Sequence, residues 1–286
     1  MRRITFTRPA ATMAVSVTGP QCGLDCAHCG AKYLKGMRPP DEALAAFPAA
    51  RAKSVLISGG SDREGRVPVE GWAERFRERS PGLRVNCHTG IMDEDRAGKL
   101  VGKVEVISYD YVSDERVVKG VYGSASSAED YVRGFITASN CAPTVPHITV
   151  GLLGPGEEPA LSIRSLEEIR ALAEGKGIPE PPAVVIIAFK PTQGTRMQDI
   201  APPDADSVAE AIRAAKRLFP SSKTCLGCMR PSGEYRDRLD VLAVESGADV
   251  IVMPSRKAVN RAEQLGLEIT YADECCAFSA LDGGAG

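Results

Sequence analysis

The residues with the clearest chemical potential are three cysteines in one short stretch, Cys22-Gly-Leu-Asp-Cys26-Ala-His-Cys29-Gly30. Thiolates hold iron–sulfur clusters, and this C-x3-C-x2-C spacing can bind three irons of a [4Fe–4S] cluster. The fourth iron would then be open to a small molecule. A structural zinc site would need a fourth ligand, and His28 is a poor one because its neighbours already crowd the loop. A disulfide framework disagrees with the odd number of thiols and with the expectation that no signal peptide is present.

The three cysteines match the cluster motif of the radical S-adenosylmethionine (SAM) superfamily. This resemblance implies that the open iron binds the amino and carboxylate groups of SAM. It also implies that one electron from the cluster cleaves SAM to methionine and a 5′-deoxyadenosyl radical. His28 stands where the superfamily usually carries an aromatic residue that packs near the adenine, so His28 is a candidate cofactor contact.

Length and composition fit one large globular domain, and they give no reason to expect binding to nucleic acid or to a membrane. The chain has 286 residues, 43% of them hydrophobic and 25% charged, with a formal net charge of -2. That charge gives no electrostatic case for nucleic acid or an anionic membrane. No apolar run approaches the roughly 20 residues that span a bilayer. Nine cysteines without export indicate a reducing compartment, so we expect a cytoplasmic protein.

The elements that must position these cysteines alternate between strands and helices. Short apolar runs predict strands near 13–18, 54–58, 84–88, 104–109, 145–150, 183–189, 223–227 and 249–253. Most are separated by stretches of helical character, at 69–78, 94–101, 127–138, 165–174, 206–218, 234–246 and 256–265. Eight strands in such an alternation indicate an α/β fold and fit a (β/α)8 TIM-type barrel over residues 1–286, although an open sheet of six strands remains an alternative. The tail, from about residue 266 to 286, is expected to fold over the barrel mouth.

A barrel of this kind places its site after the strands. The second strand runs into Ser58-Gly59-Gly60-Ser61-Asp62, which resembles the glycine-rich segment that receives the SAM amine in the superfamily. An ordinary β-turn is the alternative reading. The third strand ends at His88, a possible site residue or a structural histidine. Ser108 and Asp110 end the fourth strand and are candidates for the ribose or amine of SAM, unless Asp110 only caps a helix.

Two later loops also resemble the superfamily. The segment that begins at Gly151 is similar to the glycine-spaced motif that supports adenine packing, although glycine spacing alone is weak evidence. After the sixth strand, Pro191, Gly194 and Thr195 form a Pro-x-x-Gly-Thr turn that resembles the one in biotin synthase, where the backbone approaches the adenine.

Four further cysteines are candidates for a second metal group. Cys225 and Cys228 form a C-x2-C pair after the seventh strand, and Cys275 and Cys276 are adjacent near the C-terminus. Together they could ligate an auxiliary iron–sulfur cluster, with one of the adjacent pair idle. A redox disulfide between Cys225 and Cys228 is the main alternative. The remaining two cysteines, Cys87 and Cys141, are expected to be buried and to pack as small hydrophobic side chains.

The chain resembles a biotin-synthase-related family in three segments: Leu-Gly-Cys-Met-Arg-Pro, the Ser-Gly-Gly-Ser-Asp loop and the terminal Cys-Cys. That family includes the halves of the two-protein lipoyl synthase of archaea and some bacteria. The resemblance implies sulfur insertion into an octanoyl chain on a carrier-protein domain, a partner radical SAM protein, and an electron donor such as ferredoxin or flavodoxin. Two alternatives stay open. One is a radical SAM lyase, isomerase or methylase with a single cluster, and the other is a non-catalytic iron–sulfur scaffold.

Overall fold

The computed structural model describes residues 2–47, 51–279 and 281. The chain divides into two compact units, and each is described by itself. The N-terminal unit comprises Ala10–Val145 together with Gly194–Arg196. The C-terminal unit comprises residues 2–9, Pro146–Gln193 and the chain from Met197 onward. No helix in the described part of the chain is both long enough and apolar enough to cross a membrane.

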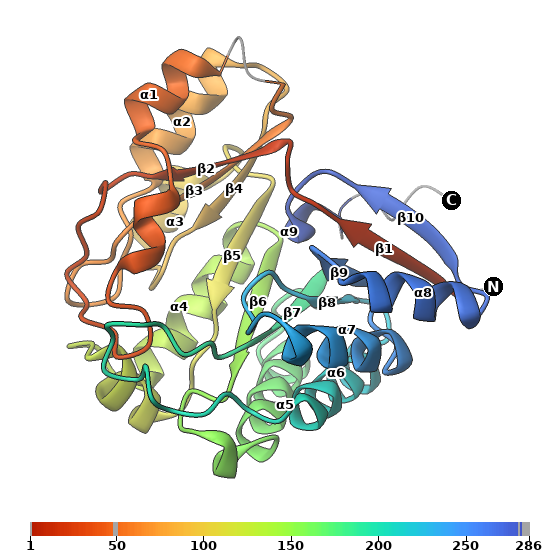
Figure 1. Ribbon diagram of the computed structural model, residues 1–286. Helices are drawn as coiled ribbons and strands as arrows, with labels where there is room; N and C mark the ends of the chain where they lie inside the picture. The colour runs from red at the N-terminus through yellow and green to blue at the C-terminus, as the bar shows by residue number, and fades with distance from the viewer. Residues whose placement is uncertain (1, 48–50, 280, 282–286) are drawn as a thin grey trace. The chain divides into compact units, whose positions relative to one another are not determined.

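The N-terminal unit is a parallel β/α layer with four strands: β2 (Thr12–Ser16), β3 (Ser54–Ser58), β4 (Arg84–His88) and β5 (Val106–Asp110). Each strand pairs in parallel with the next one along the chain. Their β-branched side chains suit a pleated, buried surface, and Val15, Ile57 and Val106 have no exposed area. The connections contain α1 (Pro40–Ala46), α2 (Glu70–Arg79), α3 (Glu94–Leu100) and α4 (Ala128–Cys141) (Figure 1).

Two helices of this unit begin at side-chain caps. The carboxylate of Asp93 accepts a hydrogen bond from the Arg96 backbone N–H at the start of α3. At the start of α4, Ser127 and Asp130 form a capping box, each accepting from the other's backbone N–H. Such caps satisfy donors that the first helical turn leaves free. The irregular segments are a 3-10 helix η1 (Lys32–Gly36) and a π-helix η2 (Val117–Tyr122).

The C-terminal unit contains the strands β6 (Thr144–Val150), β7 (Ala183–Ala188), β8 (Lys223–Leu226), β9 (Val250–Val252), β1 (Arg3–Thr7) and β10 (Glu268–Ala272). They are parallel and follow one another in that order, so β1 lies between β9 and β10. The strand β6 begins in the N-terminal unit and contains the boundary. The helices α5 (Ala160–Gly175), α6 (Ala205–Leu218), α7 (Glu234–Glu245) and α8 (Arg256–Gln264) pack side by side in sequence order (Figure 1).

The α/β class and the strand–helix alternation expected from the sequence are confirmed. All eight predicted strands are present, within about two residues of their expected ends. The structure adds β1 and β10, which pair with each other at one edge. Residues 266–279 of the predicted tail are therefore partly a sheet strand, followed by the short helix α9 (Cys276–Ser279) against β9. Residues 280 and 282–286 lie outside the described part.

Candidate functional site

The loop that carries Cys22, Cys26 and Cys29 follows β2 and is held by its own backbone. The Cys26 carbonyl accepts hydrogen bonds from the N–H groups of Cys29, at 3.1 Å, and Gly30, at 3.0 Å. The Ala27 N–H donates to the carbonyl of Val121 at the end of the π-helix, at 2.6 Å. These hydrogen bonds satisfy backbone groups of the loop within the protein and help to fix its conformation.

The thiols are close enough to perturb one another. Cys26 is buried, while Cys22 and Cys29 are half-buried. A hydrogen bond from Cys26 lowers the pKa of Cys29 to about 7, and the same contact raises the pKa of Cys26. A negative Cys22 also raises the pKa of Cys26. Once deprotonated, three thiols gathered in this way would repel one another unless a cationic group bound them, so the donor set fits a thiolate-ligated iron–sulfur cluster.

These cysteines line a cavity of ≈ 170 Å³ in the N-terminal unit. Its wall also contains residues proposed from the sequence, namely His28, Ser58, Gly59, Gly60, His88 and Asp110. At Gly60 a side chain is excluded, because a Cβ there would lie 1.9 Å from the Gln21 carbonyl oxygen and 2.5 Å from the Cys22 Cα. The Gly60 N–H donates to the Thr18 hydroxyl, at 2.7 Å. The glycine segment thus lies directly against the start of the cysteine loop.

An aromatic wall closes another side of the cavity. The His28 ring lies 5.6 Å from the Tyr122 ring, which lies 5.9 Å from the ring of Tyr131. Burial lowers the pKa of His28, although the charge of Asp110 opposes that effect, so the imidazole is neutral near pH 7. Its Nδ1 is buried and makes no hydrogen bond to the described residues. A flat neutral ring with a free nitrogen suits an aromatic, hydrogen-bonding ligand such as an adenine.

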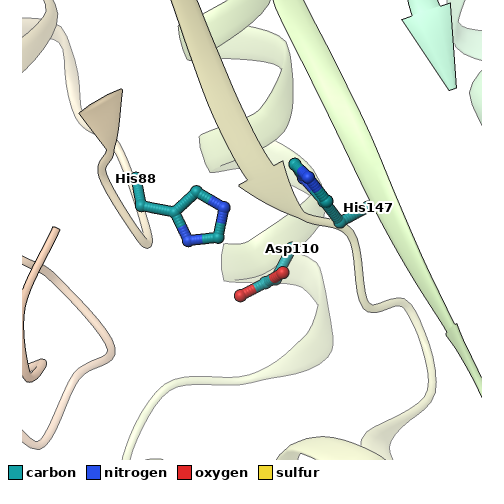
Figure 2. Close-up of side chains that lie close together, drawn as sticks. All are labelled: His88, Asp110 and His147. Atoms are coloured by element: carbon teal, nitrogen blue, oxygen red, sulfur yellow. The ribbon is translucent and has the colours of Figure 1, made fainter. Parts of the chain in front are cut away.

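Polar groups enter the cavity from the carboxyl ends of β4 and β5. A ring nitrogen of His88 and a carboxylate oxygen of Asp110 lie within 4.8 Å of each other, and both residues line the cavity. Figure 2 shows these two side chains turned toward each other, and it also draws His147 of β6. Ser108 differs from the expectation, because it is not part of this wall. It is buried, and its hydroxyl donates to the Asn86 side-chain oxygen at 3.1 Å.

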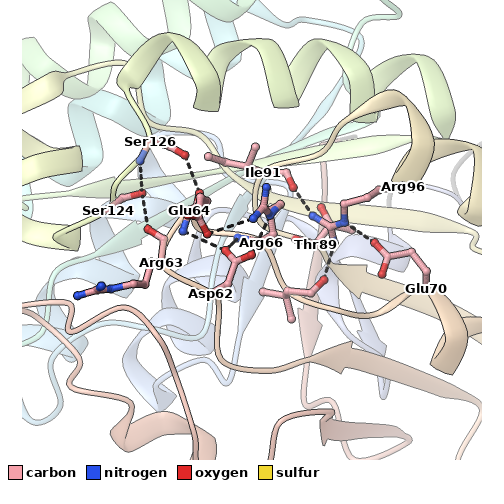
Figure 3. A network of polar contacts seen from close by, with 11 residues as sticks. Asp62, Arg63, Glu64, Arg66, Glu70, Thr89, Ile91, Arg96, Ser124 and Ser126 are labelled. Carbon is pink, nitrogen blue, oxygen red and sulfur yellow. Dashed lines mark hydrogen bonds and ion pairs between the residues drawn. The ribbon is translucent and has the colours of Figure 1, made fainter.

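The segment after Gly60 is fixed by a polar network (Figure 3). The Asp62 carboxylate accepts from the Arg66 side chain at 2.8 Å and from the Arg66 backbone N–H at 2.9 Å. Arg96 is paired with Glu70 and also donates to the carbonyls of Ile91, Val67 and Thr89. This network borders a second cavity of ≈ 670 Å³, whose wall includes Cys22 and Gly60. Asp62 therefore holds the turn rather than facing the smaller cavity.

The turn predicted after the sixth strand is divided between the two units. Gly194 and Thr195 belong to the N-terminal unit and approach the cysteine loop, where a Cβ on Gly30 would lie 3.7 Å from the Thr195 methyl group. Arg196 pairs with the Asp25 carboxylate at 2.5 Å. Pro191 belongs to the C-terminal unit.

Gly151, the other glycine expected at the cofactor, also belongs to the C-terminal unit. It has φ +97°, a backbone conformation that strains other residues, and a Cβ would lie 2.7 Å from Pro203. Its N–H donates to the Glu158 carboxylate at 2.8 Å. These contacts account for a glycine at this position without a ligand.

The structure brings the four remaining candidate cysteines together in the C-terminal unit. The Cys276 thiol is in hydrogen-bonding contact with those of Cys225 and Cys275. Cys228 interacts electrostatically with Cys275. Cys225 and Cys276 are buried, Cys275 is half-buried, and Cys228 is exposed. We refer to these four cysteines as the four-thiol group, and thiolates are the usual ligands of iron–sulfur clusters.

Sequence reasoning missed the tyrosines of the cavity. Tyr122 lies in the π-helix, and Tyr131 lies on α4, within the helical stretch expected at 127–138. A π-helix has no simple sequence signature, yet it frequently marks a functional site. Tyr33, on η1, also lines the cavity.

Comparisons with known proteins identify the fold. No family model and no curated protein matches the chain. Among solved structures, the FeFe-hydrogenase maturase HydG from Carboxydothermus hydrogenoformans has a TM-score of 0.69 at 13% identity, with 96% of this chain and 69% of that chain covered. Methylornithine synthase (PylB) has a TM-score of 0.61 at 17% identity, covering 94% and 84%. HMG-CoA lyase from Brucella melitensis has a TM-score of 0.58 at 13% identity, covering 98% and 96%. At these identities the likeness is one of fold.

Proposed function

We propose that this protein is a radical SAM enzyme that inserts sulfur, as one half of a two-protein lipoyl synthase acting on a protein-bound octanoyl chain. The observation that carries the proposal is the presence of two separate thiol groups. One is the three-cysteine loop on the cavity of the N-terminal unit, and the other is the four-thiol group of the C-terminal unit. The fold shared with HydG and PylB supports the radical SAM assignment.

The chain's own residues have distinct tasks in this proposal. Cys22, Cys26 and Cys29 hold the cluster, which when bound with SAM supplies a carbon radical for hydrogen abstraction. Gly59 and Gly60 carry no side chain that could cover their backbone. Their carbonyl oxygens can therefore accept hydrogen bonds from an ammonium group. His28 and Tyr122 offer flat faces to the adenine. Asp110 accepts hydrogen bonds from hydroxyl or amino groups at the strand end.

The four-thiol group would hold the auxiliary cluster, which is the sulfur source in this proposal. Cys225 and Cys276 are buried and in contact, whereas Cys228 and Cys275 lie toward the solvent. Soft thiolate ligands select iron–sulfur clusters over hard cations. The octanoylated carrier domain, the partner radical SAM protein and an electron donor such as ferredoxin or flavodoxin remain part of the proposal, as does a cytoplasmic location.

The test is anaerobic reconstitution followed by iron and sulfide analysis. We expect about eight irons in the wild type, and about four in a Cys225→Ala/Cys228→Ala variant that still cleaves SAM under dithionite. That variant should fail to thiolate an octanoylated peptide in the presence of the partner protein. A Cys22→Ala/Cys26→Ala/Cys29→Ala variant should lose SAM cleavage entirely. Retained cleavage in this triple variant would contradict the assignment to radical SAM chemistry.

A second function is favoured by the fold comparison. A methylornithine synthase and a FeFe-hydrogenase maturase share this fold, so a radical SAM lyase, isomerase or methylase with a single cluster is the second candidate for this chain. The same experiment separates the two. Four irons in the reconstituted wild type, with full activity in the Cys225→Ala/Cys228→Ala variant, would favour the single-cluster enzyme. Two cubanes without SAM cleavage would favour an iron–sulfur scaffold.

A further inference from the structure

A fully buried arginine stands beside the four-thiol group. The side chains of Arg230 and Asp240 have no exposed area, and they pair through two bonds, Nε–Oδ1 at 2.7 Å and Nη2–Oδ2 at 3.0 Å. Arg230 also donates to the carbonyls of Gly227 at 2.6 Å and Val252 at 2.8 Å. Removing such a pair from water costs several kcal/mol per ion, and an apolar pair is often at least as stabilising. Fold stability alone therefore does not explain this ion pair.

The ion pair instead fixes the backbone around one cysteine. Cys228 lies between Gly227, whose carbonyl Arg230 binds, and Arg230 itself. The other end of the ion pair reaches the start of α8, where the Ser255 N–H donates to Asp240 at 2.8 Å. The turn after β8 is thus tied to the end of β9 and to the start of α8. Side chains with this many hydrogen bonds are held in one rotamer, so the position of Cys228 is held as well.

A second arginine near Cys228 has a donor left over. Arg236 precedes Asp240 by four residues on α7, so the two side chains share one helix face. Its Nε is buried and makes no hydrogen bond to any described residue. Arg236 interacts electrostatically with Cys228 and Arg230. A buried donor without an acceptor is costly. Asp240 accepts from Arg230 and Ser255, and no described residue accepts from the Arg236 Nε.

We propose that Arg236 donates a charge-assisted hydrogen bond to the anionic group bound by the four thiols, and that the Arg230–Asp240 pair positions Cys228 for that group. The inference rests on the proposed auxiliary site. Hydrogen bonds to sulfur and the net charge nearby set the reduction potential of an iron–sulfur cluster. A guanidinium stabilises the more negative, reduced state, so Arg236 raises the potential of the group. Arg236 thus contacts the group without being one of its ligands, and the Arg230–Asp240 pair is the positioning element.

The experiment uses the full chain with Cys22, Cys26 and Cys29 replaced by Ala, so that only the auxiliary group contributes signal. Arg236→Gln is compared with Arg238→Gln, a matched change on the same helix at an exposed arginine that pairs with Asp206. After reconstitution, iron content is measured, and the group is titrated with dithionite under EPR detection. We expect equal iron in both variants. At the wild-type midpoint potential, Arg236→Gln should lower the ratio of reduced to oxidised group about tenfold, which for one electron corresponds to about 59 mV.

The outcomes distinguish the inference from the function on which it rests. If the wild type binds no second group, the sulfur-insertion function fails. If the group is present but Arg236→Gln titrates as Arg238→Gln does, the proposed role of Arg236 is overturned. Should Arg236→Gln not fold, Arg236→Lys keeps the charge and removes the Nε donor. We then expect a smaller shift in the same direction, and a midpoint identical to wild type would overturn the role.

Discussion

Gly60→Ala tests how tightly the glycine segment supports the cysteine loop. A Cβ at this position would lie 1.9 Å from the Gln21 carbonyl oxygen and 2.7 Å from the Cys22 Cβ, whereas real contacts rarely fall below 3.0 Å. The two segments must therefore separate by about 1 Å. The end of β3 is paired with β2 and β4 on its two sides, so the cysteine loop is the part that moves.

The expected cost falls on cluster binding more than on folding. Overpacking of this kind destabilises a protein by about 1–3 kcal/mol. A misplacement of about 1 Å at a reacting centre costs about 100-fold in rate. We therefore expect Gly60→Ala to unfold at somewhat lower urea concentration, to bind substantially less iron on reconstitution, and to lose nearly all SAM cleavage.

The control is Gly71→Ala. Gly71 is an exposed residue in α2, and a Cβ there meets nothing within 4 Å. Replacing it should stabilise the helix by about 0.5–1 kcal/mol and leave iron binding unchanged. If Gly60→Ala retains the iron content and cleavage rate of Gly71→Ala, the close approach of Gly60 to Gln21 and Cys22 does not control the conformation of the cysteine loop.

Three other predictions concern stability. Ser127→Ala should lower the free energy of unfolding by about 0.5–2 kcal/mol. Ser127 N–H and hydroxyl groups hold the pKa of Asp130 below its usual value, so this contribution is present at neutral pH and is lost as pH falls through the folded-state pKa. Urea unfolding at neutral and acidic pH should show the penalty shrinking, and a pH-independent penalty would contradict the cap. Gly134→Ala places a Cβ 2.5 Å from the Tyr109 hydroxyl and should cost about 1–3 kcal/mol, visible as a lower Tm. Phe278→Ala, which empties a fully buried site in α9, should cost about 3–5 kcal/mol and expose the terminal segment to protease, and unchanged protection would argue against its docking.

The sequence predicted the central strands because short runs rich in apolar and β-branched residues mark most of them. β7 is buried at all six positions and could be located from composition alone. By contrast, β1 and β10 are short, mix polar with apolar residues, and find their partners across nearly the whole chain. Local patterns contain no information on pairing at that separation, so both strands were missed.

The site was predictable where chemistry constrains residue types. Cysteine spacing located the loop, and glycines located the close approach to Cys22. Ser108 shows the limit, because its place at the end of a strand did not indicate that its hydroxyl would donate to Asn86. Tyr122 was missed for another reason, since the π-helix that places it arises from tertiary packing against the cysteine loop.

The position of β1 between β9 and β10 determines an order of events during synthesis on the ribosome. All four strands of the N-terminal unit lie within residues 10–145, so they can pair while the rest of the chain is still being made. Phe6 pairs with Ile251, 245 residues later, which corresponds to roughly 12–50 s of translation. During that interval Ile4 and Phe6, both buried in the finished fold, have no strand beside them. The nascent chain can thus form its three-cysteine loop before its first strand is covered on either side.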